Sequence, residues 1–202
     1  MKTDSGKRTT RVTIVVILLI VGVIAYYCYL VNRPQEGATE KTLTETDEVL
    51  LRNLSRDYPP TVKEVIKYHN DITKCLYNED CEEEEFEELV KKDRELYDNA
   101  LLQNNTWDTQ YINLVAEVTS FKESGRKLTG AKVAASVDVE YFEEEGHSFA
   151  RIPCSYTVME GTDSTTTMHI YLLRKDATGH WRIYGWDLAD NVELEVEVPA
   201  QE

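Results

Sequence analysis

The sequence predicts an α+β domain joined to an N-terminal transmembrane helix. Between residues 47 and 125, apolar side chains recur at the spacing of helices, and after Gly130 they alternate with polar ones, as in strands. Residues 12–31 form an apolar run without a single charge. Helices followed by a meander of strands are typical of the α+β class, so we expect helices packed on a curved antiparallel sheet of four strands or slightly more.

The transmembrane helix is predicted from an uncharged run of twenty residues, Val12 to Val31. At about 1.5 Å per residue this run spans about 30 Å, which is the thickness of a bilayer core. A cleaved signal peptide is the alternative, but its apolar region is usually about 7–15 residues long and ends in a small-x-small site. Here the run is longer, and Ala25-Tyr26-Tyr27 near its end is bulky. We therefore expect an uncleaved anchor.

Basic residues precede this run at Lys2, Lys7, Arg8 and Arg11. By the positive-inside rule they keep the N-terminus in the cytoplasm. The sequence therefore predicts a single-pass protein of the cell membrane with an extracellular C-terminal domain.

The net charge changes sign along the chain. The chain holds 22 basic and 37 acidic residues, a formal net charge of −15, yet residues 1–34 hold five basic residues and one acid. The remaining 168 residues therefore carry a balance of −19. Such a domain repels phosphate backbones and other polyanions, so we exclude nucleic acid as a partner. A neutral or cationic ligand, or a protein partner, remains open.

Composition divides the chain into five parts. They are a basic tail at 1–11, the transmembrane helix at 12–31, a linker at 32–46, the α+β domain at 47–190, and an acidic tail or edge strand at 191–202. The linker is polar and contains Pro34 and Gly37, a composition typical of flexible connections.

Four helices are predicted in the first half of the domain. A short one covers Asp47 to Arg56, and a second begins at Thr61, which forms a capping-box pattern with Glu64. A third follows the turn at Asn78-Glu79-Asp80 and continues to the break at Asn104-Asn105-Thr106. A fourth runs from Trp107 to a C-terminal glycine cap at Gly125.

The strands are predicted from two-residue alternation, over residues 133–141, 150–158, 165–174 and 181–188. Pro153 has no N–H to donate, so its strand must have a free side or a bulge there. The segment 181–188 is apolar on both faces, which predicts a central, well-covered strand. Residues 192–198 alternate Val or Leu with Glu and form either a further strand or a solvated tail.

Aromatic side chains on the strands are the best candidate binding residues. A bent sheet that carries Tyr and Trp on its concave face makes a pocket or an interface, although ordinary core packing explains the same pattern. The candidates are Tyr141, Tyr156, Tyr184 and Trp186.

No catalytic residue, metal site or cofactor is predicted. His69 lies on an apolar helical stripe, where a half-buried histidine is more common than a ligand or a base, and the histidines form no H-E-x-x-H pattern. The glutamates of 82–88 lack the alternating pattern of a calcium loop and suit the solvated start of a helix.

Cys75 and Cys81 are separated by five residues across a predicted turn between helices. In an oxidising compartment they are candidates for a disulfide, and free thiols are the alternative. The spacing matches no zinc pattern.

The segment Gly179-His180-Trp181-Arg182-Ile183-Tyr184-Gly185-Trp186 resembles a late strand of the nuclear-transport-factor-2-like (cystatin-related) superfamily. The resemblance implies a cone-like fold in which helices cover a strongly bent sheet. The chain also resembles an uncharacterised family of single-span membrane proteins from clostridia-type bacteria. The matching stretches are Glu48 to Tyr77, Glu95 to Asn104 and Leu172 to Asp187. That resemblance implies location and architecture and supplies no catalytic residue.

These observations favour a membrane-anchored, extracytoplasmic binding or interaction module without catalytic activity. One alternative is a bitopic subunit of a secretion or conjugation apparatus, which rests on analogy at the level of the fold. Another is an enzyme that acts on a small ligand inside the cone. A buried aspartate that faces a histidine or tyrosine in a pocket would favour the enzyme.

Overall fold

The computed structural model describes residues 44–189, which belong to one compact unit, Leu43–Glu202. Several predictions lie outside these residues: the basic tail at 1–11, the transmembrane helix at 12–31, nearly all of the linker and the strand at 192–198. Of the helices that are described, none has the length and apolarity to cross a membrane.

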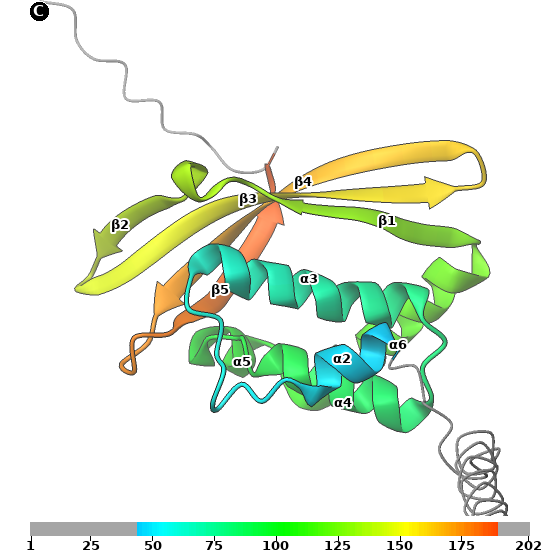
Figure 1. Ribbon diagram of the computed structural model, residues 1–202, viewed down its shortest axis with the longest axis horizontal. Coiled ribbons are helices and arrows are strands. Elements are labelled where there is room, and N and C mark those ends of the chain that lie inside the picture. Colours follow the sequence, from blue (N-terminus) through cyan, green and yellow to red (C-terminus); the bar gives the residue numbers. More distant parts are fainter. Residues whose placement is uncertain (1–43, 190–202) are drawn as a thin grey trace, which may run out of the picture. The chain divides into compact units, whose positions relative to one another are not determined.

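The described helices precede the sheet and lie on one side of it (Figure 1). Their bounds are α2 (Glu45–Leu51), α3 (Val62–Asn78), α4 (Glu83–Arg94), α5 (Asn99–Asn104) and α6 (Trp107–Glu123). The capping box predicted for α3 is present in part, since the Glu64 backbone N–H donates to Thr61 Oγ1 at 3.2 Å. The Glu64 carboxylate accepts from the Thr61 hydroxyl instead of reaching the backbone.

The sheet is open and antiparallel, which confirms the predicted α+β class. Its strands are β1 (Arg126–Val133), β2 (Glu140–Glu144), β3 (His147–Glu160), β4 (Asp163–Lys175) and β5 (Trp181–Leu188). The order is β1-β3-β4-β5, and β2 also pairs with β3. β1 and β2 therefore lie end to end along the same side of β3, as Figure 1 shows.

The prediction of one continuous strand over 133–141 is wrong, because the chain leaves the sheet after Val133. A single 3-10 turn, Ser136–Asp138, separates β1 from β2, and Val137 at its centre is 90% exposed. The interruption faces Pro153 on β3, which has no N–H to continue the ladder. The free side predicted at Pro153 is therefore present, and it divides the neighbouring strand into two.

Two predicted helices are also shorter than expected. The helix predicted over 47–56 ends at Leu51, and the third predicted helix ends at Arg94. The chain turns at Glu95 and Leu96, and the residues Leu96 to Asp98 exchange two hydrogen bonds of 2.8 Å with Ile183 of β5. The Asp98 side chain then caps α5 by accepting from the Ala100 backbone N–H.

Within residues 44–189, the prediction of a central position for 181–188 is wrong, because β5 is the outermost strand in the order β1-β3-β4-β5. Backbone hydrogen bonds with the segment Leu96–Asp98 cover its outer edge at Ile183. On its other edge β5 pairs with β4, but only with the portion His169–Lys175 of that strand. In the described part of the chain, Asp163–Met168 of β4 therefore form an edge.

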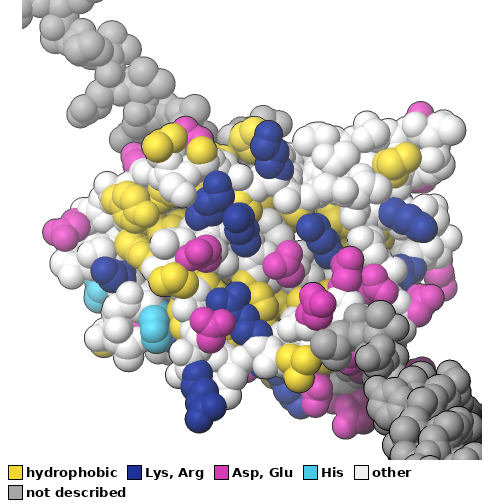
Figure 2. All heavy atoms as spheres, in the orientation of Figure 1, with side chains coloured by type: hydrophobic (Ala, Val, Ile, Leu, Met, Phe, Trp, Pro, Cys, Tyr) yellow, Lys and Arg dark blue, Asp and Glu magenta, His cyan; other side chains and the backbone are white. Residues whose placement is uncertain are grey.

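The core lies between the sheet and α3. Alternate residues of β3 point toward the helices, as predicted: Ala150, Ile152, Cys154 and Tyr156 are all buried. The largest fully buried side chains come from every layer, and they include Ile66, Ile72, Leu89, Leu173 and Ile183. On the face drawn in Figure 2, hydrophobic side chains appear in small groups among Lys, Arg, Asp and Glu.

Replacing the fully buried Ile152 by Ala should destabilise the domain by about 2–5 kcal/mol, because the lost methyl groups leave a cavity between α3 and the sheet. Urea denaturation of the full chain, followed by tryptophan fluorescence, measures the loss. The control is Ile112→Ala on α6, where the side chain is 65% exposed and should change stability by at most about 0.5 kcal/mol. Equal losses for both variants would contradict the assignment of the core.

Candidate functional site

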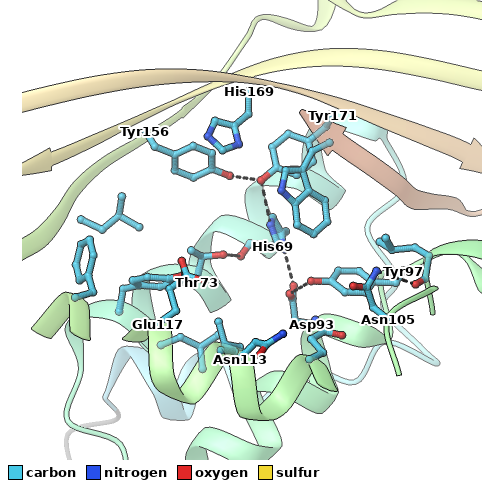
Figure 3. A pocket seen from close by; sticks show the side chains of 18 of the residues that line it. His69, Thr73, Asp93, Tyr97, Asn105, Asn113, Glu117, Tyr156, His169 and Tyr171 are labelled. Carbon is cyan, nitrogen blue, oxygen red and sulfur yellow. Dashed lines mark hydrogen bonds and ion pairs between the residues drawn. The ribbon is translucent and has the colours of Figure 1, made fainter. Parts of the chain in front are cut away.

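A cavity of about 460 Å³ lies between the helices and the sheet. The α3 residues that line it, His69, Thr73, Leu76 and Tyr77, share one face of that helix, since they recur at intervals of three and four. The opposite wall comes from the sheet, with Tyr156, Val158, His169, Tyr171 and Trp186 among its residues. Figure 3 shows the side chains of both walls turned toward one another.

α6 closes another side of the cavity. Its residues Gln110, Asn113, Leu114, Glu117 and Phe121 line the space at helical spacing. Only Val118 of this helix is buried, so α6 is held mainly by partly buried contacts.

A continuous chain of hydrogen bonds crosses from the helices to the sheet (Figure 3). Asp93 Oδ1 lies 2.6 Å from His69 Nδ1, and His69 Nε2 lies 3.2 Å from the Tyr171 hydroxyl. The Tyr171 and Tyr156 hydroxyls are 2.6 Å apart. Tyr156 donates to Asn70 Oδ1 at 2.5 Å, and the chain ends where Asn70 Nδ2 donates to the Cys154 thiol.

The number of available protons fixes the direction of this chain. The contacts His69–Tyr171, Tyr171–Tyr156 and Tyr156–Asn70 each need one hydrogen, and the two hydroxyls supply only two. His69 Nε2 must therefore supply the third. His69 Nδ1 then faces Asp93 Oδ1 across the remaining hydrogen bond, so both ring nitrogens are engaged.

The polar atoms of the Asp93–His69 pair are all engaged. The second oxygen of Asp93 accepts from the Tyr97 hydroxyl at 2.5 Å. The two side chains of the pair are only 8% and 10% exposed. Burial raises the pKa of Tyr156 and Tyr171 well above the ordinary value, so both hydroxyls keep their protons at neutral pH.

His169 differs from His69 because one of its nitrogens has no partner. In the described part of the chain, His169 Nδ1 is a buried atom without a hydrogen bond. Burial lowers the pKa of His169, against a smaller effect of Asp187, and favours the neutral ring. Figure 3 shows this ring at the sheet wall beside Tyr156, and their centroids are 5.2 Å apart.

Trp186 forms the rim of the cavity. Its ring centroid lies 5.7 Å from that of Tyr171, and 6.0 Å from those of His69 and Tyr97. The side chain is nevertheless 42% exposed, so one of its surfaces contacts solvent.

The structure brings two of the four predicted aromatic residues into the cavity, Tyr156 and Trp186. Tyr184 lies elsewhere, because a bulge between Leu172 and Leu173 of β4 shifts its register, and its ring contacts Phe149 and the Arg174 guanidinium. Tyr141 on β2 is 59% exposed and its ring lies 5.6 Å from that of Trp181.

Asp93 is the main site residue that sequence reasoning missed. It follows Leu89 by four positions and Val90 by three, which places a carboxylate on the apolar face of α4. A buried carboxylate requires donors, and His69 on the apolar stripe of the preceding helix is the matching signal.

Cys75 and Cys81, the candidate disulfide pair, are both free cysteines in the structure. Cys81 Sγ instead lies 3.8 Å from the Cys75 carbonyl oxygen and 3.9 Å from the Thr46 hydroxyl. Burial raises the pKa of the Cys75 thiol to about 11, which disfavours the thiolate. The structure shows no cluster of three metal-ligating side chains among residues 44–189.

Comparison with known proteins identifies the family. A protein-family model described as a domain of unknown function, DUF6715, matches residues 1–186. The chain belongs to the DUF6715 family. This confirms the expected membership of an uncharacterised family, and the match includes the apolar run at 12–31 as well as the domain described above. No curated protein matches this DUF6715 chain.

Replacing Asp93 by Asn in the DUF6715 chain should destabilise the domain by about 3–5 kcal/mol, because the change leaves the buried His69 without its carboxylate. Glu160→Gln is the matched control. It breaks an ion pair with Arg126 whose side chains are 48% and 56% exposed, so its effect should be about 0–1 kcal/mol. Urea denaturation of both variants measures the difference. A cost for Asp93→Asn no larger than for the control would contradict the central role of this pair.

Proposed function

We propose that the domain is a non-catalytic module that binds a small ligand in the cavity between α3, α6 and the sheet. The observation that carries the proposal is the cavity itself. Its volume of about 460 Å³ lies within the range of about 300–1,000 Å³ typical of ligand pockets. Leu76, Leu114, Leu128 and Val158 supply apolar walls, and a few polar groups converge on the same space.

An enzyme is the second candidate, because the buried Asp93 faces His69 and Tyr97 at the wall of a cavity. The engagement of this group favours binding over catalysis. Both nitrogens of His69 and both oxygens of Asp93 already contact protein groups, so none is available for a proton of the ligand.

Filling the cavity should abolish ligand binding. We expect the neutral apolar probe N-phenyl-1-naphthylamine to bind the full chain, with energy transfer from Trp186 at the rim. Leu114→Trp adds an indole on the cavity side of α6 and should weaken probe binding about tenfold or more, since the added ring occupies the apolar space.

Ile112→Trp is the matched control, because it adds the same ring to the same helix at a side chain that is 65% exposed. It should leave probe binding unchanged within about twofold. If the unsubstituted chain fails to bind the probe, or if Leu114→Trp binds it equally well, the proposed function is wrong.

We further propose that residues 12–31 anchor the domain to the outer face of the cell membrane, and that its fold is the cone of the nuclear-transport-factor-2-like superfamily. The uncharged apolar run and the basic residues before it support the anchor. The match of one family to both the run and the domain is consistent with this arrangement. Helices on one side of an antiparallel sheet, with a cavity between them, support the cone (Figure 1).

Two arginines within the run should release the protein from the membrane. The double substitution Ile17→Arg and Leu18→Arg places charges that cost about 2.5–3.5 kcal/mol each at the centre of a bilayer. Alkaline carbonate extraction of cell membranes should retain the unsubstituted chain and release this variant. Thr9→Arg with Thr10→Arg, in the basic tail, is the control and should stay in the membrane. Retention of both variants would contradict the anchor.

A further inference from the structure

Every hydroxyl that lines the cavity donates its proton to the protein itself. Thr73 donates to the His69 carbonyl oxygen at 2.8 Å and Tyr77 to Glu117 Oε1 at 2.5 Å. Tyr97 donates to Asp93. The proton count in the chain of hydrogen bonds assigns the remaining two, with Tyr171 donating to Tyr156 and Tyr156 to Asn70. These hydroxyl oxygens therefore present only lone pairs to a ligand.

The charged side chains of the lining also favour a cationic ligand over an anionic one. The residues around the cavity include no lysine or arginine, and both oxygens of Asp93 are already engaged, by His69 and by Tyr97. The carboxylate of Glu117 is left without a basic partner among the lining residues. An anion would find no unpaired positive group here, whereas a cation would find one unpaired negative group.

A pair of aromatic rings lines the cavity next to this carboxylate. Tyr77 and Phe121 meet edge to face with their centroids 5.0 Å apart, and Phe121 lies one helical turn after Glu117 on α6. Burial and the hydrogen bond to Glu117 raise the pKa of Tyr77, so this phenol remains a donor to Glu117. Glu117 is an exposed residue at the edge of the cavity, where its carboxylate attracts an ammonium group by charge and the neighbouring rings add the attraction of their quadrupoles.

We propose that the ligand is a small primary amine in its ammonium form. The ammonium group lies at Glu117, beside the edge-to-face pair of Tyr77 and Phe121, and the apolar body fills the space beside Leu114 and Val158. An ammonium group brings three donors and no acceptor, which complements a lining that is rich in lone pairs. This inference rests on the proposed binding function and assigns the chemical class of the ligand.

Three compounds with the same naphthalene body test the inference on the full chain. They are 2-(1-naphthyl)ethylamine, 2-(1-naphthyl)ethanol and 1-naphthylacetate, and each competes with N-phenyl-1-naphthylamine for the cavity. We expect the ammonium compound to bind about five times more tightly than the alcohol and at least about ten times more tightly than the carboxylate, because a charge-assisted hydrogen bond is stronger than a neutral one.

The variant Glu117→Gln should bring the affinity of the ammonium compound to within about twofold of the alcohol and leave binding of the apolar probe unchanged. Glu123→Gln is the matched control. It removes the same charge from the same helix at a residue outside the lining, and the preference for the ammonium compound should persist. Raising the salt concentration should lower this preference in the unsubstituted chain.

The amine inference is overturned if the alcohol or the carboxylate binds as tightly as the ammonium compound, or if Glu117→Gln and Glu123→Gln have equal effects. It is also overturned if none of the three compounds displaces a bound probe. In all these cases the binding function stands as long as the probe itself binds and Leu114→Trp excludes it. Failure of the probe to bind would contradict the proposed binding function itself.

Discussion

The buried pair of Asp93 and His69 is the interaction on which the packing of this domain depends. It joins α4 to α3, and through Tyr171 it joins both helices to the sheet. A carboxylate on a side chain that is only 10% exposed would be very unfavourable without donors, so Asp93 must meet His69 and Tyr97 at the same time. That requirement fixes the position of α4 and of the segment that leads from it to β5, because Tyr97 belongs to this segment.

The same interaction defines one wall of the cavity. A fully apolar interface would allow the helices and the sheet to pack more closely, whereas the chain from Asp93 to Asn70 holds Tyr171 and Tyr156 between the two layers (Figure 3). Each hydroxyl in this series of hydrogen bonds donates its proton to the next member of the series. The wall therefore offers hydroxyl lone pairs, which are acceptors, to the cavity beside it. The chemistry of the site thus follows from how the protein satisfies its own buried groups.

The class of the fold follows from local patterns, and the places where prediction fails depend on contacts distant in sequence. Helical spacing and caps located the starts of α3 and α6, and alternation identified the buried face of β3. The segment Leu96–Asp98 was missed because its hydrogen bonds are made to Ile183. In the site, Tyr156 and Trp186 lie at the cavity as strand alternation suggests, whereas the bulge opposite Leu172 and Leu173 turns Tyr184 away. Asp93 was missed because an aspartate in a helix is assigned to the solvent-exposed face unless a buried partner for its carboxylate is known.

The long hairpin of β3 and β4 has a further consequence for solubility. The strand β4 extends beyond the end of β5. Its portion Asp163–Met168 pairs with β3 but has no partner on the side of β5, and it consists mainly of serine and threonine. Threonine keeps a strand extended through its branched side chain, yet its hydroxyl binds water. An exposed strand of valine or isoleucine in this position would be a template for pairing between molecules. The composition of this edge therefore protects the domain against aggregation, although none of the described helices covers it.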